Sequence, residues 1–325
     1  MDSRPGPRPR PRVLCAGIVV ADVFVPPLER MPEPGELVAT EDFVVETGGC
    51  AANTAVALAR LGITTAVVAK VGDDLFGAFV EQELAAAGVD VSGVGRAPGL
   101  GTSKTVIVPV SGEDRRYFHT FGANAALAAV DIGAALTPAP EILSIGGYLV
   151  LPSLRQDELV EQLATARRAG ARTVFDVVAP TGRALSVADV AGVLPEVDYF
   201  LPNDDEAGAL TGESDPRLQA ERLLDLGAGT VVVTLGERGL LAMSGAETIE
   251  LPAAHVEVVE PSGAGDAFAA GLICGLLEGF GLRRALELAS VIGASACTRI
   301  GCTAGLYTRT QADAHLKQAL WPSPR

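Results

Sequence analysis

Short runs of β-branched residues alternate along the chain with longer stretches rich in Ala and Leu. The short runs predict strands, and the longer stretches, with apolar residues at helical spacing, predict helices. This alternation predicts an α/β fold with a doubly wound, mostly parallel sheet flanked by helices. The expected strands are Val13–Val20, Thr64–Val71, Ile142–Ile145, Arg172–Asp176, Tyr199–Leu201 and Thr230–Leu235. The expected helices include Ala51–Leu61, Phe76–Ala87, Leu154–Ala169, Pro216–Leu226, Ala264–Glu278, Arg283–Thr298 and Gln311–Ala319.

Two segments, residues 36–46 and 103–121, interrupt this alternation and predict antiparallel strands. Inserted strands of this kind form either a small β lid over the carboxyl ends of the sheet strands or a plain surface hairpin. We expect one domain over residues 13–320 that contains both segments. The preceding residues 1–12 are rich in Pro and Arg, a composition that predicts a disordered tail.

Composition narrows the class of protein. The chain has 325 residues, 48% of them hydrophobic, which supports a large core and excludes a disordered protein. Its formal charge of −15 argues against nucleic acid and anionic membranes as partners. No apolar run approaches the roughly 20 residues of a membrane-spanning helix, and no signal peptide is evident, so a cytoplasmic location is expected. The five cysteines and three histidines show no metal-binding spacing.

The most informative stretch is Gly263-Ala264-Gly265-Asp266, a glycine turn that leads directly into a predicted helix. Such a turn exposes backbone N–H groups at the positive end of the helix, which suits a phosphate. Asp266 lies beside this site and could accept a proton from an attacking hydroxyl. Alternatively, it is only a favourable acid in a first helical turn, and this stretch alone does not decide.

A second glycine turn, Gly48-Gly49, opens the helix that contains Asn53. The Asn53 amide both donates and accepts hydrogen bonds, which suits sugar hydroxyls, or it merely satisfies the turn. Cys50 has no visible partner base, so we interpret it as a small apolar filler rather than a reactive thiol. Asp22 ends the first predicted strand, where open α/β sheets bind ligands, although one acid there is not specific.

Two further stretches carry weaker signals. Asn203 and Glu206, three residues apart after a strand, offer the oxygen ligands that Mg²⁺ prefers, yet acids at a helix start are common. Thr234, Gly236 and Gly239 follow another predicted strand. They would contact a nucleotide or form an ordinary hairpin.

Three common motifs are absent from the sequence. The only lysines are Lys70, Lys104 and Lys317, and because none follows a glycine, a P-loop NTPase is excluded. The first predicted strand is not followed by G-x-G-x-x-G, which disfavours a dinucleotide-binding Rossmann domain. No G-x-S-x-G motif supports a serine hydrolase.

Taken in order, these stretches resemble the ribokinase-like (PfkB) carbohydrate kinases over nearly the whole chain. The most specific part is the run from Gly263 to Asp266 with Phe268 and Gly271. The N-terminal signature is similar: Gly48-Gly49, Asn53, Ala55, Leu58, Arg60-Leu61-Gly62 and then Gly72-Asp73-Asp74-Leu75-Phe76-Gly77. The later stretches follow in the family's order and spacing: Asn203-x-x-Glu206 and Thr234-x-Gly236-x-x-Gly239.

The resemblance implies an enzyme that transfers the γ-phosphoryl group of ATP to a hydroxyl of a small sugar or sugar derivative. It implies Asp266 as the catalytic base and the amides of Gly263, Ala264 and Gly265 as the anion hole. The other implied roles are sugar binding by Asp22, Gly48, Gly49 and Asn53, nucleotide binding by Asn203, Glu206, Thr234, Gly236 and Gly239, and Mg²⁺ binding, through water, by Glu206. The inserted strands would form the family's lid, which excludes water and in many members joins a homodimer.

Several positions depart from the family pattern. Glu260 and the proline after it replace an Asp-Thr pair whose Asp helps to coordinate K⁺ in some members, so Glu260 is a candidate for a K⁺ site and no more. Ser290 stands where many members place an asparagine near adenine. Cys50 replaces the ribokinase lysine, and no glutamate follows the strand near Gly147, so ribose is not the favoured substrate.

Two other functions stay open. A nucleoside kinase of the same fold would use Phe43, Phe118 and Phe121 to stack on a base, unless these rings pack the lid's own interface. A catalytically silent sugar- or nucleotide-binding regulator is supported only by the change at Glu260, and the retained Asp266 argues against it. The sugar and the hydroxyl that is phosphorylated do not follow from motifs, because pocket shape sets them.

Overall fold

The computed structural model describes residues 11–112 and 115–318, which fold around a nine-stranded sheet. The strands lie in the order β13-β12-β11-β10-β9-β8-β1-β4-β5. Their bounds are β1 (Val13–Gly17), β4 (Thr65–Val71), β5 (Asp90–Arg96), β8 (Ile142–Gly146), β9 (Arg172–Phe175), β10 (Tyr199–Phe200), β11 (Thr230–Thr234), β12 (Leu240–Ser244) and β13 (Thr248–Leu251). Neighbouring strands from β5 to β11 are parallel, and β12 and β13 are antiparallel at one edge.

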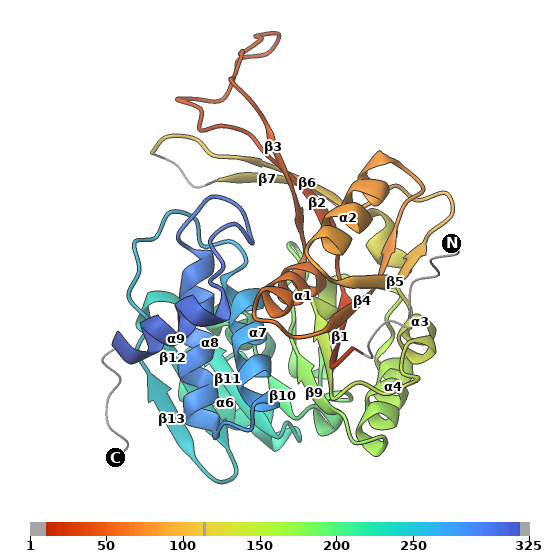
Figure 1. Cartoon of the computed structure of the whole chain (residues 1–325), viewed down its shortest axis with the longest axis vertical. Helices are drawn as coiled ribbons and strands as arrows, with labels where there is room; N and C mark the ends of the chain where they lie inside the picture. The colour runs from red at the N-terminus through yellow and green to blue at the C-terminus, as the bar shows by residue number, and fades with distance from the viewer. Residues whose placement is uncertain (1–10, 113–114, 319–325) are drawn as a thin grey trace, which may run out of the picture.

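Helices cover both faces of this sheet (Figure 1), which confirms the predicted doubly wound α/β class. One face carries α1 (Cys50–Arg60), α2 (Leu75–Ala86), α7 (Ala264–Leu277), α8 (Leu282–Ala296) and α9 (Arg309–Gln318). The other carries α3 (Ala129–Ala134), α4 (Gln156–Arg168), α5 (Asp204–Thr211) and α6 (Pro216–Asp225). Each face has its own apolar core, with Leu58 fully buried in the first and Phe175 in the second. Within the described ranges, no helix is both long and apolar enough to cross a membrane.

A second sheet of four strands, which we call the lid, projects from one end of the molecule (Figure 1). Its order is β3-β2-β6-β7, with bounds β2 (Val20–Phe24), β3 (Val44–Gly48), β6 (Lys104–Val108) and β7 (Arg116–Thr120). One row of paired residues across it is Glu46, Asp22, Thr105 and His119. The neighbouring row is Val45, Val23, Val106 and Phe118. Because successive side chains along a strand point to opposite faces, the two rows lie on opposite faces of the lid.

The path into the lid corrects the prediction of one first strand over Val13–Val20. β1 ends at Gly17, where a Cβ would lie 2.1 Å from the Gly146 carbonyl oxygen, and β2 then begins in the other sheet. Apolar residues continue through both strands, so periodicity could not show the break. Only the end of the predicted segment 36–46 is a strand, β3, whereas segment 103–121 contains the expected hairpin of β6 and β7.

The predicted N-terminal tail, residues 1–12, is described only from Pro11 onward. Arg12 is bound to the body of the domain, because its Nε donates to Glu141 Oε1 at 2.5 Å and its Nη2 donates to the Leu277 carbonyl at 3.3 Å. The expected disorder of residues 1–10 concerns positions outside the described residues and stays a prediction.

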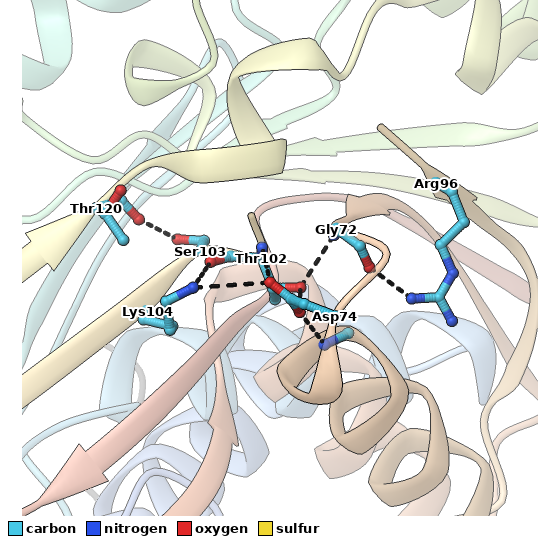
Figure 2. A network of polar contacts seen from close by, with 8 residues as sticks. Gly72, Asp74, Arg96, Thr102, Ser103, Lys104 and Thr120 are labelled. Carbon is cyan, nitrogen blue, oxygen red and sulfur yellow. Dashed lines mark hydrogen bonds and ion pairs between the residues drawn. The ribbon is translucent and has the colours of Figure 1, made fainter. Parts of the chain in front are cut away.

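Asp74 joins the base of the lid to α2 (Figure 2). Its Oδ1 accepts hydrogen bonds from the Gly77 amide at 2.8 Å, which caps α2, and from the Thr102 hydroxyl at 2.6 Å. Its Oδ2 accepts from the Thr102 amide at 2.8 Å, and the Thr102 hydroxyl accepts from the Gly72 amide at 2.9 Å. These bonds fix the point where the chain enters β6, so the run from Gly72 to Gly77 has a structural role.

Candidate active site

The predicted anion-binding turn lies at the start of α7, on the face that α1 also covers. Gly263 caps this helix with φ +78°, in the left-handed region, and a Cβ there would lie 2.5 Å from the Cys302 carbonyl oxygen. Glycine is therefore required at this position. Around Gly265 there is open space, so a ligand can approach the backbone amides at the positive end of α7.

Asp266 follows this turn and is held by α1. Asn53 Nδ2 donates to Asp266 Oδ2 at 2.8 Å, and the Thr54 hydroxyl donates to the Asp266 carbonyl oxygen at 3.3 Å. Burial raises the pKa of Asp266, and hydrogen bonds from Asn53 and Cys50 oppose this increase. The structure thus brings two predicted site residues from distant glycine turns into direct contact.

Asp176, which the sequence analysis did not single out, lies in the same site. Ligand atoms of Cys50, Asp176 and Asp266 all lie within 4.8 Å of one another, and the Gly147 amide donates to Asp176 Oδ2 at 3.2 Å. Burial raises the pKa of Asp176 well above its usual range, and the charges of Glu206 and Asp266 raise it further. Asp176 directly follows β9, so the strand-end argument used for Asp22 could have found it.

Cys50 occupies the first position of α1, within this group of acids. Burial raises the pKa of its thiol well above the ordinary value, and the neighbouring charge of Asp266 raises it further. The thiol therefore stays protonated at neutral pH and lacks the thiolate that nucleophilic chemistry needs. The interpretation of Cys50 as a filler agrees with this electrostatic environment.

Asn203 and Glu206 form a reciprocal cap at the start of α5. The Glu206 amide donates to Asn203 Oδ1 at 2.8 Å, and the Asn203 amide donates to Glu206 Oε2 at 3.0 Å. The Asn203 side chain is thus engaged by the helix start. Burial nevertheless raises the pKa of Glu206 to about 7. Hydrogen bonds from backbone amides oppose this increase, and the charge of Asp266 adds to it. Glu206 therefore interacts electrostatically with Asp266 and Asp176.

A pocket of about 680 Å³ borders the anion-binding turn. Its lining includes the predicted nucleotide contacts Thr234, Gly236 and Gly239, together with Ala264 and Gly265 of the turn. Apolar side chains from Ala253 to Val258 and from α7 and α8 form much of the rest, and Ser290 lines it as well. The structure therefore joins two sequence-distant glycine turns in one pocket, mostly apolar with a few polar groups, as small-molecule sites are.

Asp22 lies in the middle of lid strand β2, not at the end of the first sheet strand as expected. It is buried, and a Cβ on Gly48 would lie 1.8 Å from Asp22 Oδ2, so Gly48 makes room for this carboxylate. Gly49 caps α1 at φ +93°, where a Cβ would lie 2.6 Å from the Ile18 carbonyl oxygen. Burial raises the pKa of Asp22 to about 6, although a hydrogen bond from Thr105 opposes the increase.

Glu260, the candidate K⁺ ligand, has other partners. Its Oε1 accepts hydrogen bonds from the Ser262 amide at 3.0 Å and from the Ser262 hydroxyl at 2.7 Å, and it forms an ion pair with Arg115. Arg115 directly precedes lid strand β7, so the lid reaches the anion-binding turn here. Arg115 belongs to no local motif, so its role at this turn could not be expected from the sequence.

Comparisons with known proteins agree with this geometry. Residues 10–309 match the family described as pfkB family carbohydrate kinase. A deoxyribokinase of Salmonella typhi is 31% identical over 247 residues, covering 74% of this chain and 77% of the relative. A 2-dehydro-3-deoxygluconokinase of Bacillus subtilis is 30% identical over 286 residues, covering 85% and 88%. The crystal structure of a putative ribokinase II from E. coli with ATP and Mg²⁺ superposes with a TM-score of 0.78 at 22% identity, covering 95% and 100%.

The doubly wound sheet, its lid and the glycine turn beside a half-buried carboxylate define the ribokinase-like fold. The chain belongs to the pfkB family of carbohydrate kinases and is an ATP-dependent phosphotransferase that acts on an alcohol group. The predicted family, fold class and enzyme class are thereby confirmed.

Proposed function

We propose that this enzyme transfers the γ-phosphoryl group of ATP to a hydroxyl of a small sugar or sugar derivative, with Asp266 as the base. The contact between Asn53 and Asp266 carries the proposal, because it fixes a half-buried carboxylate next to an anion-binding turn. On one side this turn borders the nucleotide pocket. On the other side Asp266 lies within electrostatic range of Asp22.

In the proposed reaction, the acceptor hydroxyl gives its proton to the Asp266 carboxylate as its oxygen attacks the γ-phosphorus. The new P–O bond forms while the bond between the γ-phosphorus and the bridging oxygen breaks, and ADP leaves. The amides of Gly263, Ala264 and Gly265 would stabilise the negative charge on the transferred group. Asn53 keeps Asp266 oriented and favours its ionised form.

ATP would occupy the pocket that borders the anion-binding turn. The volume of about 680 Å³ suits a ligand of this size. Thr234, Gly236 and Gly239 would contact the nucleotide, and Ser290 would lie near the base. The ATP complex of the E. coli relative supports this role for the fold.

Mg²⁺ would be held near Glu206, directly or through water. These carboxylates fit a divalent cation, because the charge of Glu206 raises the pKa of Asp176 and the charge of Asp266 raises the pKa of Glu206, a repulsion that a cation would relieve. When bound, the ion would neutralise charge on the phosphates. Asn203 would support the site by capping α5 rather than as a ligand, since its side-chain oxygen already accepts the Glu206 amide.

A K⁺ site at Glu260 does not fit the residues present. The Glu260 carboxylate already has a positive partner in the Arg115 guanidinium and two donors in Ser262. We therefore propose that Arg115 supplies the positive charge at this position and that turnover does not depend on K⁺.

The lid would cover the acceptor and contact a second copy of the chain. Phe118 lies in the row with Val45, Val23 and Val106, on the face opposite Asp22. Phe118 is 58% exposed and Val45 is 40% exposed. An apolar outer face of this kind favours packing between two lids over stacking of Phe118 on a nucleoside base.

The experiment for the proposed function measures ADP release from ATP and Mg²⁺ with a panel of pentoses, hexoses, sugar acids and nucleosides, in K⁺ and in Na⁺ buffer. Release that depends on a sugar and is equal in both buffers is the expected result. ADP release that occurs only with nucleosides would show that the acceptor is a nucleoside and not a sugar. ATP binding without turnover on any acceptor would favour the silent regulator.

A further inference from the structure

Two acids lie directly opposite each other in the lid. Glu46 on β3 is the register partner of Asp22 on β2, so both side chains are on one face. Like charges opposite each other across two strands are destabilising. This face meets the body of the domain at Gly301 and Cys302, because a Cβ on Gly301 would lie 2.1 Å from Glu46 Oε2, and Cys302 Sγ lies 4.0 Å from Asp22 Oδ2.

The charges that shift the pKa values of this acid pair are negative. Burial raises the pKa of Glu46, a hydrogen bond from Cys302 opposes the increase, and the charge of Asp22 raises it further. Burial also raises the pKa of the Cys302 thiol, and Asp22, Asp266 and Glu46 all add to the increase. Cys302 therefore marks a place where the lid acids and the proposed base converge.

The free polar atoms at this place are hydrogen-bond acceptors. Glu46 Oε2 and Asn53 Oδ1 are buried and have no hydrogen-bond partner. Asn53 is 4% exposed, and its amide orientation is fixed because Nδ2 donates to Asp266. An unpaired buried acceptor is unfavourable until a donor reaches it. A ligand with O–H or N–H groups would therefore satisfy these two atoms.

We propose that the acceptor of the phosphoryl group carries no negative charge, and that Glu46 is a specificity residue that binds its donor groups and rejects sugar acids and sugar phosphates. The inference rests on the proposed function, since it concerns the acceptor of that reaction. A hydroxyl or ammonium group satisfies Glu46 and Asn53, whereas a carboxylate or phosphate would be placed among Glu46, Asp22 and Asp266. Rejection by such repulsion is a common way to obtain specificity.

The test compares neutral acceptors with their anionic derivatives, such as fructose with fructose 6-phosphate and an aldose with its aldonate. For the wild type, kcat/KM of the neutral member should exceed that of the anionic member by about a hundredfold. Glu46→Gln should raise the KM of the neutral acceptor about tenfold and leave the KM of ATP unchanged. The ratio of kcat/KM between the neutral and the anionic acceptor should therefore decrease. The matched control is Glu41→Gln, an exposed acid on the segment that precedes β3.

A binding measurement separates this inference from the proposed reaction. The shift of the thermal midpoint by each acceptor is recorded for the wild type and both variants, without ATP. Shifts by neutral or amino sugars that Glu46→Gln reduces and Glu41→Gln retains support the inference even if turnover fails. Three results would overturn the inference. They are a preference for an anionic acceptor, the absence of a shift with a neutral or amino sugar, and a ratio of kcat/KM between neutral and anionic acceptors that Glu46→Gln leaves unchanged.

Discussion

The carboxylate of Asp266 is subject to two opposing influences. Burial favours its neutral form, and the hydrogen bond from Asn53 favours its ionised form. A general base must be ionised to accept a proton, yet basic enough to hold it during transfer. The balance between burial and Asn53 therefore sets the pH range in which this residue can act.

Loss of the Asn53 amide should disturb that balance. Because the Asn53 bond lowers the pKa of Asp266, Asn53→Ala should raise it and move the acidic limb of the kcat–pH profile upward. We expect kcat to fall about ten- to a hundredfold at neutral pH, the typical effect of losing a hydrogen bond to a charged group. Thr54→Val is the control, since Thr54 contacts only the backbone oxygen of Asp266. An unshifted acidic limb in Asn53→Ala would argue against this role.

Asp22 should reduce stability while it supports activity. Its folded-state pKa of about 6 lies above the ordinary aspartate value of 3.8, so the contribution of Asp22 to stability is fully present below pH 3.8 and is lost as the pH rises through 6. At pH 7.5 the loss is up to about 3 kcal/mol. Asp22→Asn should therefore raise the thermal midpoint above that of the wild type at pH 7.5, and by more than it does at pH 5. The variant should also lower kcat/KM for the acceptor. Equal pH dependence in the variant and the wild type would contradict the burial argument.

At the scale of elements, the junction between α2 and the lid depends on Asp74. Burial opposes ionisation, but hydrogen bonds from Thr102 and Gly77 outweigh it and lower the pKa of Asp74 to about 2. Its contribution to stability is therefore present above pH 3.8 and is lost as the pH falls through 2. The lid base is thus held by a carboxylate that stays ionised at all physiological pH values.

Asp74→Asn should lower the free energy of unfolding by about 1 to 3 kcal/mol at pH 7, because the amide NH2 replaces Oδ2, the acceptor of the Thr102 amide, and leaves that amide without a partner. The difference from the wild type should shrink as the pH approaches 2, where the wild-type carboxylate is also protonated. Urea unfolding at pH 7 and at pH 3 measures both effects. Asp73→Asn, the exposed neighbour, is the control and should leave the stability unchanged.

The predicted helices with clear starts were located well, for physical reasons. α6 begins where Asp215 accepts the Arg217 amide at 2.8 Å and Pro216 takes the first helical position. The change of sheet between β1 and β2 was not predictable, because apolar residues continue without interruption from Val13 to Ala21 and close packing at Gly17 ends the first strand. The edge strands β12 and β13 were not predicted either, since their alternation is short.

At the scale of the whole molecule, much of the candidate site carries a sequence signal because its residues occupy helix starts and strand ends. Asp266, Asn53 and the glycines of the pocket beside α7 carry this local signal. Glu46 and Arg115 do not, because their roles depend on cross-strand register and on where the lid meets the body. Contacts between distant segments of this kind cannot be read from local pattern.

The outer face of the lid gives a prediction for assembly. We expect the wild type to be a dimer, and Phe118→Glu to convert it to a monomer because a charge would enter the apolar row. Sedimentation velocity measures the two states. Val130→Glu places the same charge on an exposed valine of α3 and should leave the dimer intact. A wild type that is monomeric at micromolar concentration would contradict the lid contact.

The central claim is that Asp266 takes the proton of the acceptor, and Asp266→Asn tests it most directly. The account predicts that kcat falls about a thousandfold, within the usual range for a lost general base, while calorimetry shows that ATP binding is retained. Asp225→Asn, on the exposed face of α6, should retain full turnover. Turnover of Asp266→Asn close to that of the wild type would contradict the account.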